Sequence, residues 1–507
     1  MRLGCACFIL LALLTTLSLA APSPCDQKEA RELWRVRAQT ITDDLLKDAT
    51  DLSPMQRAVL WAKLGQRWWR EDPKRARVWI TNAIEVVEQE VPNKETPEER
   101  QERLETASVL LAIVTPLDSK LGKKLLTVLV SDKSTDNEHS AAANALIDAA
   151  VTVVKDDPKR AYELGALALR TGRPNNSIRE LLFPLRASSP KLADSLFDQA
   201  LDLVKQDPQS RLLNSLLYVA FPAQRGLGDN IPVPPEPLRS ELLQVLVGLL
   251  TANPGGDKCG VVTWMSQFFT EIERLLPKQW LVVRQAINQC QSTSTSPPDQ
   301  RQIDDATLAM EHKDYELALK LLDDMPKEAR GESWDSNRWQ WAADGAIEHY
   351  KNSRFGEMNL MLDAVPSDLQ LLAKTGFIQW LPERAGSETA PIIQILNDAL
   401  KGLRRSNIPE KYNWYFGLLR STIKYQPADA NAVLKDAIAS LNQVKDETPL
   451  NTTDYMKYIG PPLLEMDEFV VKDALASVTQ VPMRAQLRLS LLNATLQRMR
   501  NAESVAK

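Results

Sequence analysis

The stretch WAKLGQRWWREDPKRA, residues 61–76, decides the fold prediction because it holds the end of one helix and the start of the next. Asp72-Pro73 supplies an N-cap and a proline at the first helical position, where the missing N–H costs nothing. The first helix has its apolar face at Trp61, Leu64, Gly65 and Trp68. The second has its own at Ala76, Trp79, Ile80, Ala83, Ile84 and Val87. Because both spacings are helical and the turn is short, the stretch predicts an αα-hairpin.

The start of the first helix is predicted by Ser53-Pro54-Met55-Gln56. Ser is the expected N-cap, Pro stands at the first helical position, and Gln stands where its side chain can bond back to the cap. We therefore expect this helix to begin at Pro54 and to end before Asp72.

The second helix of the hairpin recurs along the chain. Counted from a proline, alanine stands at +3 and +10, and large apolar or small residues stand at +6, +7 and +11. The copies are Pro73 with Ala76, Trp79, Ile80, Ala83 and Ile84; Pro158 with Ala161, Leu164, Gly165, Ala168 and Leu169; Pro190 with Ala193, Leu196, Phe197, Ala200 and Leu201; and Pro427 with Ala430, Val433, Leu434, Ala437 and Ile438. Two helices cannot bury such faces alone, so the pattern predicts stacked hairpins.

A second internal similarity lies in the C-terminal half. HKDYELALKLLDDMP (312–326) and NSRFGEMNLMLDAVP (352–366) match at four positions with a spacing of 40: Tyr315/Phe355, Leu322/Leu362, Asp323/Asp363 and Pro326/Pro366. Any amphipathic helical protein will show some internal similarity of this kind.

Composition supports a helical protein. Glycine accounts for 19 of 507 residues, about half the usual share of ~7%, whereas β-rich and Rossmann folds use glycine at turns and ligand contacts. Apolar residues make up 44%, which is enough for a large core. The net charge of −5 offers no basic excess for a phosphate backbone, so nucleic-acid binding is not expected. The predicted fold class is all-α.

The pattern W-x-x-L-G-x-x-W at Trp61, Leu64, Gly65 and Trp68 resembles the first helix of a tetratricopeptide repeat, with Trp where that family usually has Tyr. Ala76, Ile80 and Ala83 resemble its second helix, about one residue early, and Tyr315, Ala318 and Leu322 resemble that signature again. The prolines at 73, 116, 158 and 190 are spaced unevenly, whereas the family repeats every ~34 residues. The resemblance implies an irregular α-solenoid of stacked helical hairpins that binds a protein or peptide along a groove. It assigns no family functional residue.

The N-terminal residues have the pattern of an export signal. Arg2 precedes an apolar run from Phe8 to Leu19, which is shorter than the ~20 residues of a membrane-spanning helix. Ser18 and Ala20 are small enough for the −3 and −1 positions of a cleavage site, so residues 1–20 are expected to be a signal peptide, with an uncleaved anchor as the alternative. We expect an exported, periplasmic or extracellular bacterial protein with no membrane span after signal removal.

Cys259 and Cys290 are predicted to form a disulfide. With Cys25, they are the three cysteines of the mature chain, so at most one intrachain bridge can form. Cys259 opens an apolar helical stretch, a turn follows at Pro277, and Cys290 ends the next stretch, so an antiparallel pair would bring the two thiols together. The bridge would close a loop of about 30 residues and add about 3–4 kcal/mol in the chain-entropy model. Three unlinked cysteines are the alternative.

The polar stretch QSTSTSPPDQ has no large apolar side chain and is predicted to be a linker. The expected organisation is a signal peptide at 1–20, an N-terminal helical-repeat domain at 26–290, the linker at 291–300 and a C-terminal helical domain at 301–507.

The sequence shows no catalytic or cofactor-binding signature. Its 3 histidines form no H-E-x-x-H motif, and its cysteines are too dispersed for a thiolate metal site. No nucleophile elbow, Walker loop or dinucleotide fingerprint occurs. We therefore expect no enzyme activity, no cofactor and no metal.

Tryptophan is in excess, with 12 residues against 10 Phe and 9 Tyr. Exposed indole rings would suit peptides or glycans, whereas packing between hairpins is the plainer interpretation. The candidate partner-binding residues are Trp69, Arg70, Trp334 and Trp339.

The leading hypothesis is an exported, non-enzymatic helical-repeat protein that binds a protein or peptide as a scaffold or adaptor. The rival is an α/α-toroid enzyme that acts on cell-wall or extracellular polysaccharide, with scattered carboxylates and Trp platforms as its glycan site. A deep pocket of convergent carboxylates beside exposed Trp would favour the rival. A shallow open groove would favour the scaffold.

Overall fold

The computed structural model describes residues 24–89, 96–130, 136–174, 177–208, 211–222, 231–252, 258–291, 305–310, 312–325, 332–381, 389–408, 411–444 and 459–504. These residues are helical, with short 3-10 turns and loops and no strand among them, which confirms the all-α prediction. Within the same residues, no helix combines the length and the apolar character needed to cross a membrane.

The chain divides into two units. Unit 1 is Met1–Leu52 with Leu400–Lys507, and unit 2 is Ser53–Ala399. This grouping places the first described helix with the C-terminal helices, whereas the sequence analysis assigned it to a domain at 26–290. The predicted signal peptide at 1–20 and residues 292–300 of the predicted linker lie outside the described residues, so the division at 291–300 stays a prediction.

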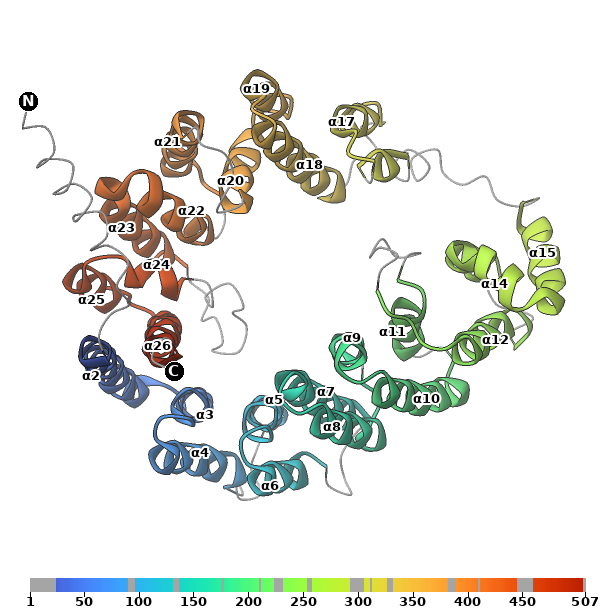
Figure 1. Ribbon diagram of the computed structural model, residues 1–507, viewed down its shortest axis with the longest axis horizontal. Helices are drawn as coiled ribbons and strands as arrows, with labels where there is room; N and C mark the ends of the chain where they lie inside the picture. The colour runs from blue at the N-terminus through green and yellow to red at the C-terminus, as the bar shows by residue number, and fades with distance from the viewer. Residues whose placement is uncertain are drawn as a thin grey trace, which may run out of the picture. The chain divides into compact units, whose positions relative to one another are not determined.

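The first ten helices of unit 2 form two rows (Figure 1). Helices α3, α5, α7, α9 and α11 pack each on the next, and so do α8, α10 and α12, while α4 packs on α6. Paired helices such as α3 and α4 or α7 and α8 join the rows. The bounds are α3 (Pro54–Trp68), α4 (Pro73–Glu88), α5 (Pro97–Val114), α6 (Ser119–Leu129), α7 (Asp136–Val153), α8 (Pro158–Thr171), α9 (Ile178–Ser188), α10 (Pro190–Gln206), α11 (Arg211–Ala220) and α12 (Glu236–Ala252).

The α3–α4 hairpin forms as predicted. The N–H of Gln56 donates to Ser53 Oγ (3.2 Å) and the N–H of Ser53 donates to Gln56 Oε1 (3.3 Å), which completes the capping box. Asp72 caps α4 by accepting from the N–H of Arg75 at 3.1 Å. Gly65 lets the two helices touch, because a Cβ there would lie 2.5 Å from Cγ1 of Ile80.

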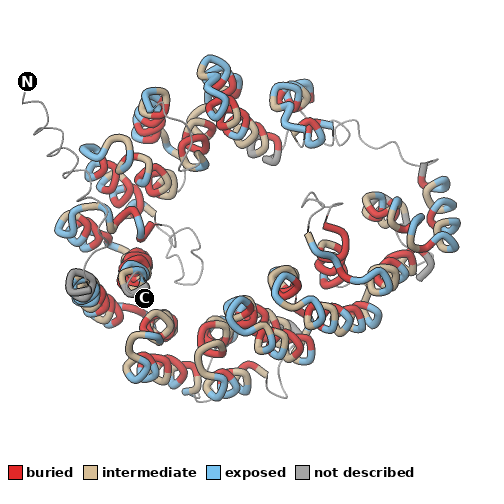
Figure 2. The backbone as a smooth tube through the Cα atoms, viewed as in Figure 1, coloured by how far each residue is buried: buried red, intermediate tan, exposed pale blue. Residues whose placement is uncertain are grey.

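The repeated pattern describes the buried face of each helix that carries it. All five patterned positions after Pro73, Pro158, Pro190 and Pro427 are buried. Figure 2 shows these buried segments alternating with exposed ones along the helices. The side chains of Asp72, Asp118 and Asp157 each accept from backbone N–H groups at the start of the following helix. The small residues of the pattern therefore serve close helix packing, and the aspartates fix where each helix begins.

The predicted cysteine pair lies in the next hairpin of unit 2. Its helices are α13 (Lys258–Met265), a 3-10 turn at Ser266–Phe268, α14 (Phe269–Leu275) and α15 (Pro277–Gln291). Cys259 on α13 and Cys290 on α15 have Cα atoms 5.4 Å apart, and their Sγ atoms are bonded. The turn at Pro277 therefore brings the two ends of this hairpin together, as the sequence predicts.

The remaining helices of unit 2 are α17 (Tyr315–Asp323), α18 (Glu332–Lys351), α19 (Phe355–Asp363), α20 (Gln370–Trp380) and α21 (Ala390–Arg405), the last of which spans the boundary of the two units. Helix α18 packs on α17, α19 and α20.

The 40-residue similarity corresponds to equivalent turns before α17 and α19. Lys313 and Ser353 have positive φ angles of 59° and 57°, the only such non-glycine residues among those described. After each, a backbone N–H reaches back five residues: Asp314 to the carbonyl of Ala309, and Arg354 to that of His349, both at 2.9 Å. This is the helix-ending bond of a left-handed C-cap. The two similar segments therefore share the same backbone turn.

Unit 1 is built from both ends of the chain. Its helices are α2 (Pro24–Asp48), a 3-10 turn at Ala49–Asp51, α22 (Lys411–Tyr425), a 3-10 turn at Pro427–Asp429, α23 (Ala430–Leu441), α24 (Gly460–Leu464), α25 (Glu468–Ala476) and α26 (Val481–Ser504). Helix α2 packs along α26, and α24 and α25 also contact α26.

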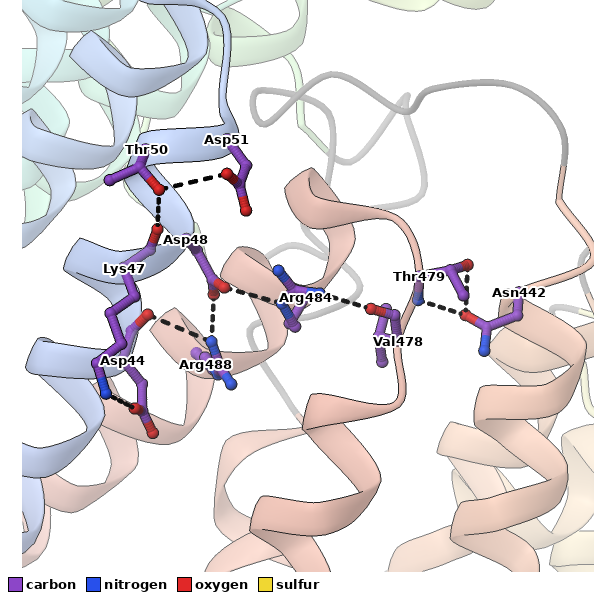
Figure 3. Close-up of polar contacts among 10 residues, drawn as sticks. All are labelled: Asp44, Lys47, Asp48, Thr50, Asp51, Asn442, Val478, Thr479, Arg484 and Arg488. Atoms are coloured by element: carbon purple, nitrogen blue, oxygen red, sulfur yellow. Dashed lines mark hydrogen bonds and ion pairs between the residues drawn. The ribbon is translucent and has the colours of Figure 1, made fainter.

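A cluster of polar contacts joins α2 to α26 (Figure 3). The carboxylate of Asp48, whose side chain is 4% exposed, accepts from Nε of Arg484 at 2.8 Å and from Nη1 of Arg488 at 2.5 Å. Arg484 also donates to the carbonyl of Val478 at 2.9 Å, and Arg488 to that of Asp44 at 3.3 Å. The first and last helices of unit 1 are thus held by a nearly buried ion-pair cluster.

Candidate functional site

A hollow of about 320 Å³ opens between α17 and α19, over α18. Its volume is at the lower end of the range of ~300–1,000 Å³ that is typical of ligand sites. The lining residues are Glu316, Leu319, Lys320 and Asp323 of α17, Arg338 of α18, and Glu357, Leu360, Met361 and Ala364 at α19.

The hollow exists because α17 and α19 do not pack closely on each other. Residues of α17 that face it recur at intervals of three and four and are charged: Glu316, Lys320 and Asp323. Such intervals place them on one side of the helix. On α19 the facing residues are Glu357, Leu360, Met361 and Ala364. Both walls therefore mix charged and apolar side chains.

Arg338 forms the floor of the hollow and ties its two walls together. Its side chain is 4% exposed. Nη2 donates to the carbonyl of Ala364 at 2.7 Å, at the end of α19, and Nη1 contacts the carbonyl of Leu319 at 3.4 Å and pairs with Asp323. The last carbonyls of a helix lack intrahelical partners and carry partial negative charge, so the guanidinium at Ala364 stabilises the C-terminal end of α19.

The rim of the hollow carries groups that the fold leaves unpaired. Glu316 and Glu357 are exposed, lie on opposite walls, and form no ion pair within the part of the chain that the structure describes. Leu360, beside Glu357, is 72% exposed. Asp323 is already neutralised by Arg338. The rim thus offers two carboxylates, the single cation of Lys320 and an apolar surface.

Trp334 does not have the exposed position that a partner-binding residue needs. It is 9% exposed, and its Nε1–H donates to the carbonyl of Leu322 at 2.7 Å. The guanidinium of Arg338 lies 5.5 Å from the centre of its ring. The indole therefore packs beneath α17 and supports the floor of the hollow, which agrees with the packing interpretation of the tryptophans.

Trp339 is half-buried and stacks on Trp380, with ring centres 5.4 Å apart and planes inclined by 23°. Gly376 makes room for this pair, because a Cβ there would lie 2.8 Å from Cζ3 of Trp339. Trp380 is 42% exposed. The sequence analysis missed Trp380 as a partner of Trp339, since its position is not in the same cluster of the sequence.

Trp69 and Arg70 lie at the end of α3 and do not line the hollow. Trp69 is half-buried. Arg70 is 73% exposed and is 3.8 Å from a carboxylate oxygen of Asp156, which is 79% exposed. A pair this open contributes little to stability, so both residues stay accessible without forming a site together with Trp334 and Trp339.

The described residues contain no group of three or more His, Cys, Asp and Glu side chains that could hold a metal ion. The residues that line the hollow were missed in the sequence because each reads as an ordinary surface position. One signal was available in the internal similarity. Leu360 occupies the position that Lys320 has in the matching segment 40 residues earlier, so an apolar residue replaces a charged one there.

The chain matches no family model, no curated protein and no solved structure.

Proposed function

We propose that this chain is an exported helical-repeat protein that binds a partner protein or peptide as a scaffold or adaptor. The observation that carries the proposal is the open hollow between α17 and α19, with an exposed leucine on its rim and two carboxylates that form no ion pair with any described residue. A hollow that is lined by apolar side chains and carries a few charged groups has the general form of a binding site.

The arrangement of unit 2 supports the same proposal. Consecutive helices from α3 to α12 pair across two rows, and successive helices within a row contact each other, apart from α6 and α8. We interpret this arrangement as an irregular α-solenoid of stacked hairpins. Each repeat of a solenoid contacts only its neighbours, so the outer residues of many helices are free to form an extended binding surface.

Two observations favour the rival function, an enzyme acting on cell-wall or extracellular polysaccharide. Helix α2 packs on α26, and in an α/α-toroid the first and last helices pack on each other. The stacked pair of Trp339 and Trp380 has the form of an aromatic platform for a sugar ring. Against this, the carboxylates of the hollow have no exposed indole beside them among its described lining residues.

Crosslinking in the native host tests the proposal. The mature chain is crosslinked in intact cells, captured, and its adducts are identified by mass spectrometry, with fractionation of the envelope to establish export. A reproducible protein adduct in the exported fraction supports the scaffold. Capture of glycan alone, together with release of reducing ends from purified cell wall or polysaccharide, would replace the scaffold with the enzyme.

A further inference from the structure

We infer that the hollow between α17 and α19 binds a segment of the partner protein that carries a leucine-like side chain flanked by two basic residues. This inference rests on the proposed function, because it names the site and the chemistry of the partner.

The apolar requirement comes from the wall and floor. Leu319 and Met361 are 4% and 5% exposed, whereas Leu360 on the same surface is 72% exposed. An apolar side chain that enters the hollow would cover Leu360 and contact the other two. Covering Leu360 removes apolar surface from water, so loss of the Leu360 contact should weaken binding by roughly tenfold or more.

The basic requirement comes from the rim. Glu316 and Glu357 stand on opposite walls, and neither is paired among the described residues. Among the described lining residues, Lys320 is the only cation left over once Arg338 is paired with Asp323. Two carboxylates against one cation give these described rim residues a net charge of −1, so a segment with a Lys or Arg on each side of its apolar residue complements them.

Three synthetic peptides test the inference with the purified mature chain. Each is a fluorescein-labelled peptide of about 12 residues: one has Leu flanked by Lys, one has Leu flanked by Glu, and one has Ser flanked by Lys. Binding is measured by fluorescence anisotropy up to about 1 mM, which corresponds to a binding free energy of about −4 kcal/mol. The Lys-Leu-Lys peptide should bind at least tenfold more tightly than either of the others.

Matched variants assign the binding to the hollow. Leu360→Gln should weaken binding of the Lys-Leu-Lys peptide about tenfold. Leu281→Gln on α15, which replaces a leucine that is 68% exposed, should leave this binding unchanged. Glu316→Lys with Glu357→Lys should abolish its preference over the Glu-flanked peptide. Glu102→Lys with Asp198→Lys changes the net charge equally at exposed sites on α5 and α10 and should preserve that preference.

The inference is overturned if the Lys-Leu-Lys peptide does not bind, if the Glu-flanked peptide binds as well, or if the matched variants behave alike. Binding of an oligosaccharide that is lost with Leu360→Gln would also overturn it, in favour of a glycan. None of these results removes the proposed function, because the partner protein found by crosslinking in cells could then bind to another surface of the chain. Absence of any such adduct would count against the proposed function itself.

Discussion

Replacement of Asp48 by Asn should release α2 from α26. Asp48 accepts two charged hydrogen bonds, from Arg484 and Arg488, and its own side chain is 4% exposed. An asparagine keeps one acceptor oxygen but turns an N–H₂ group toward the second guanidinium. One charged hydrogen bond is lost, which is worth about 1.5–3 kcal/mol.

The ionic attraction is lost as well, but the two arginines are 17% and 12% exposed, so solvent screens part of it. Breaking a fully buried pair destabilises by about 3–5 kcal/mol. We therefore expect Asp48→Asn to lower the free energy of opening of the α2–α26 contact by about 2–3 kcal/mol, which is a fall of roughly 30- to 150-fold in amide protection.

Amide hydrogen exchange of the whole chain, read on peptides from α2 and α26, measures this effect. Asp43→Asn on the exposed side of α2 is the matched control and should change protection by less than about 0.5 kcal/mol. A triple variant, Asp48→Leu with Arg484→Met and Arg488→Met, should recover most of the loss, since apolar groups can replace a buried ion-pair cluster. Equal protection in Asp48→Asn and wild type would refute the view that this cluster holds the two ends of the chain together.

Three further changes test the packing of unit 2. Gly65→Ala should destabilise the α3–α4 hairpin by about 1–3 kcal/mol because its Cβ would overlap Ile80. Gly248→Ala, which has open space around it in α12, should stabilise the protein by up to about 1 kcal/mol. Thermal unfolding compares the two variants, and equal effects would disprove the close contact between Gly65 and Ile80. Arg338→Leu should speed amide exchange in α17 and α19 by tenfold or more through the loss of its hydrogen bond to the carbonyl of Ala364. Unchanged exchange in these helices would show that Arg338 does not stabilise them. Cys290→Ser should lower the opening free energy of the α13–α15 hairpin by about 3–4 kcal/mol, because the bridge spans 31 residues. Chemical reduction of the wild-type protein should lower it by the same amount. If neither change has an effect, the two thiols are not linked.

The helix faces could be predicted because their signals are local. Asp72-Pro73 marks a helix start within two residues, and the buried set from Ala76 to Val87 recurs at the spacing of one helix face. The Cys259–Cys290 pair followed from the same logic, since a turn at Pro277 brings the ends of a hairpin together. Patterns of this kind depend on neighbours in the sequence and need no knowledge of the tertiary fold.

The pairing of α2 with α26 could not be predicted in this way. Asp48 and Arg484 are 436 residues apart, and nothing in either helix names its partner. The hollow was missed for a related reason. Glu316, Glu357 and Leu360 acquire a shared role only when α18 holds α17 and α19 apart. Trp334 was proposed as a partner-binding residue but is buried, because a tryptophan packed under a helix cannot be distinguished in the sequence from one on the surface.

Site-specific photocrosslinking from position 360 tests the central claim most directly. A photoreactive phenylalanine derivative replaces Leu360, and in a parallel strain Leu281, and both are irradiated in the native host. We expect a discrete protein adduct from position 360 that disappears in the Glu316→Lys, Glu357→Lys background and is absent from position 281. Adducts that are equal at both positions, or none at position 360, would contradict the assignment of this hollow as a partner-binding site.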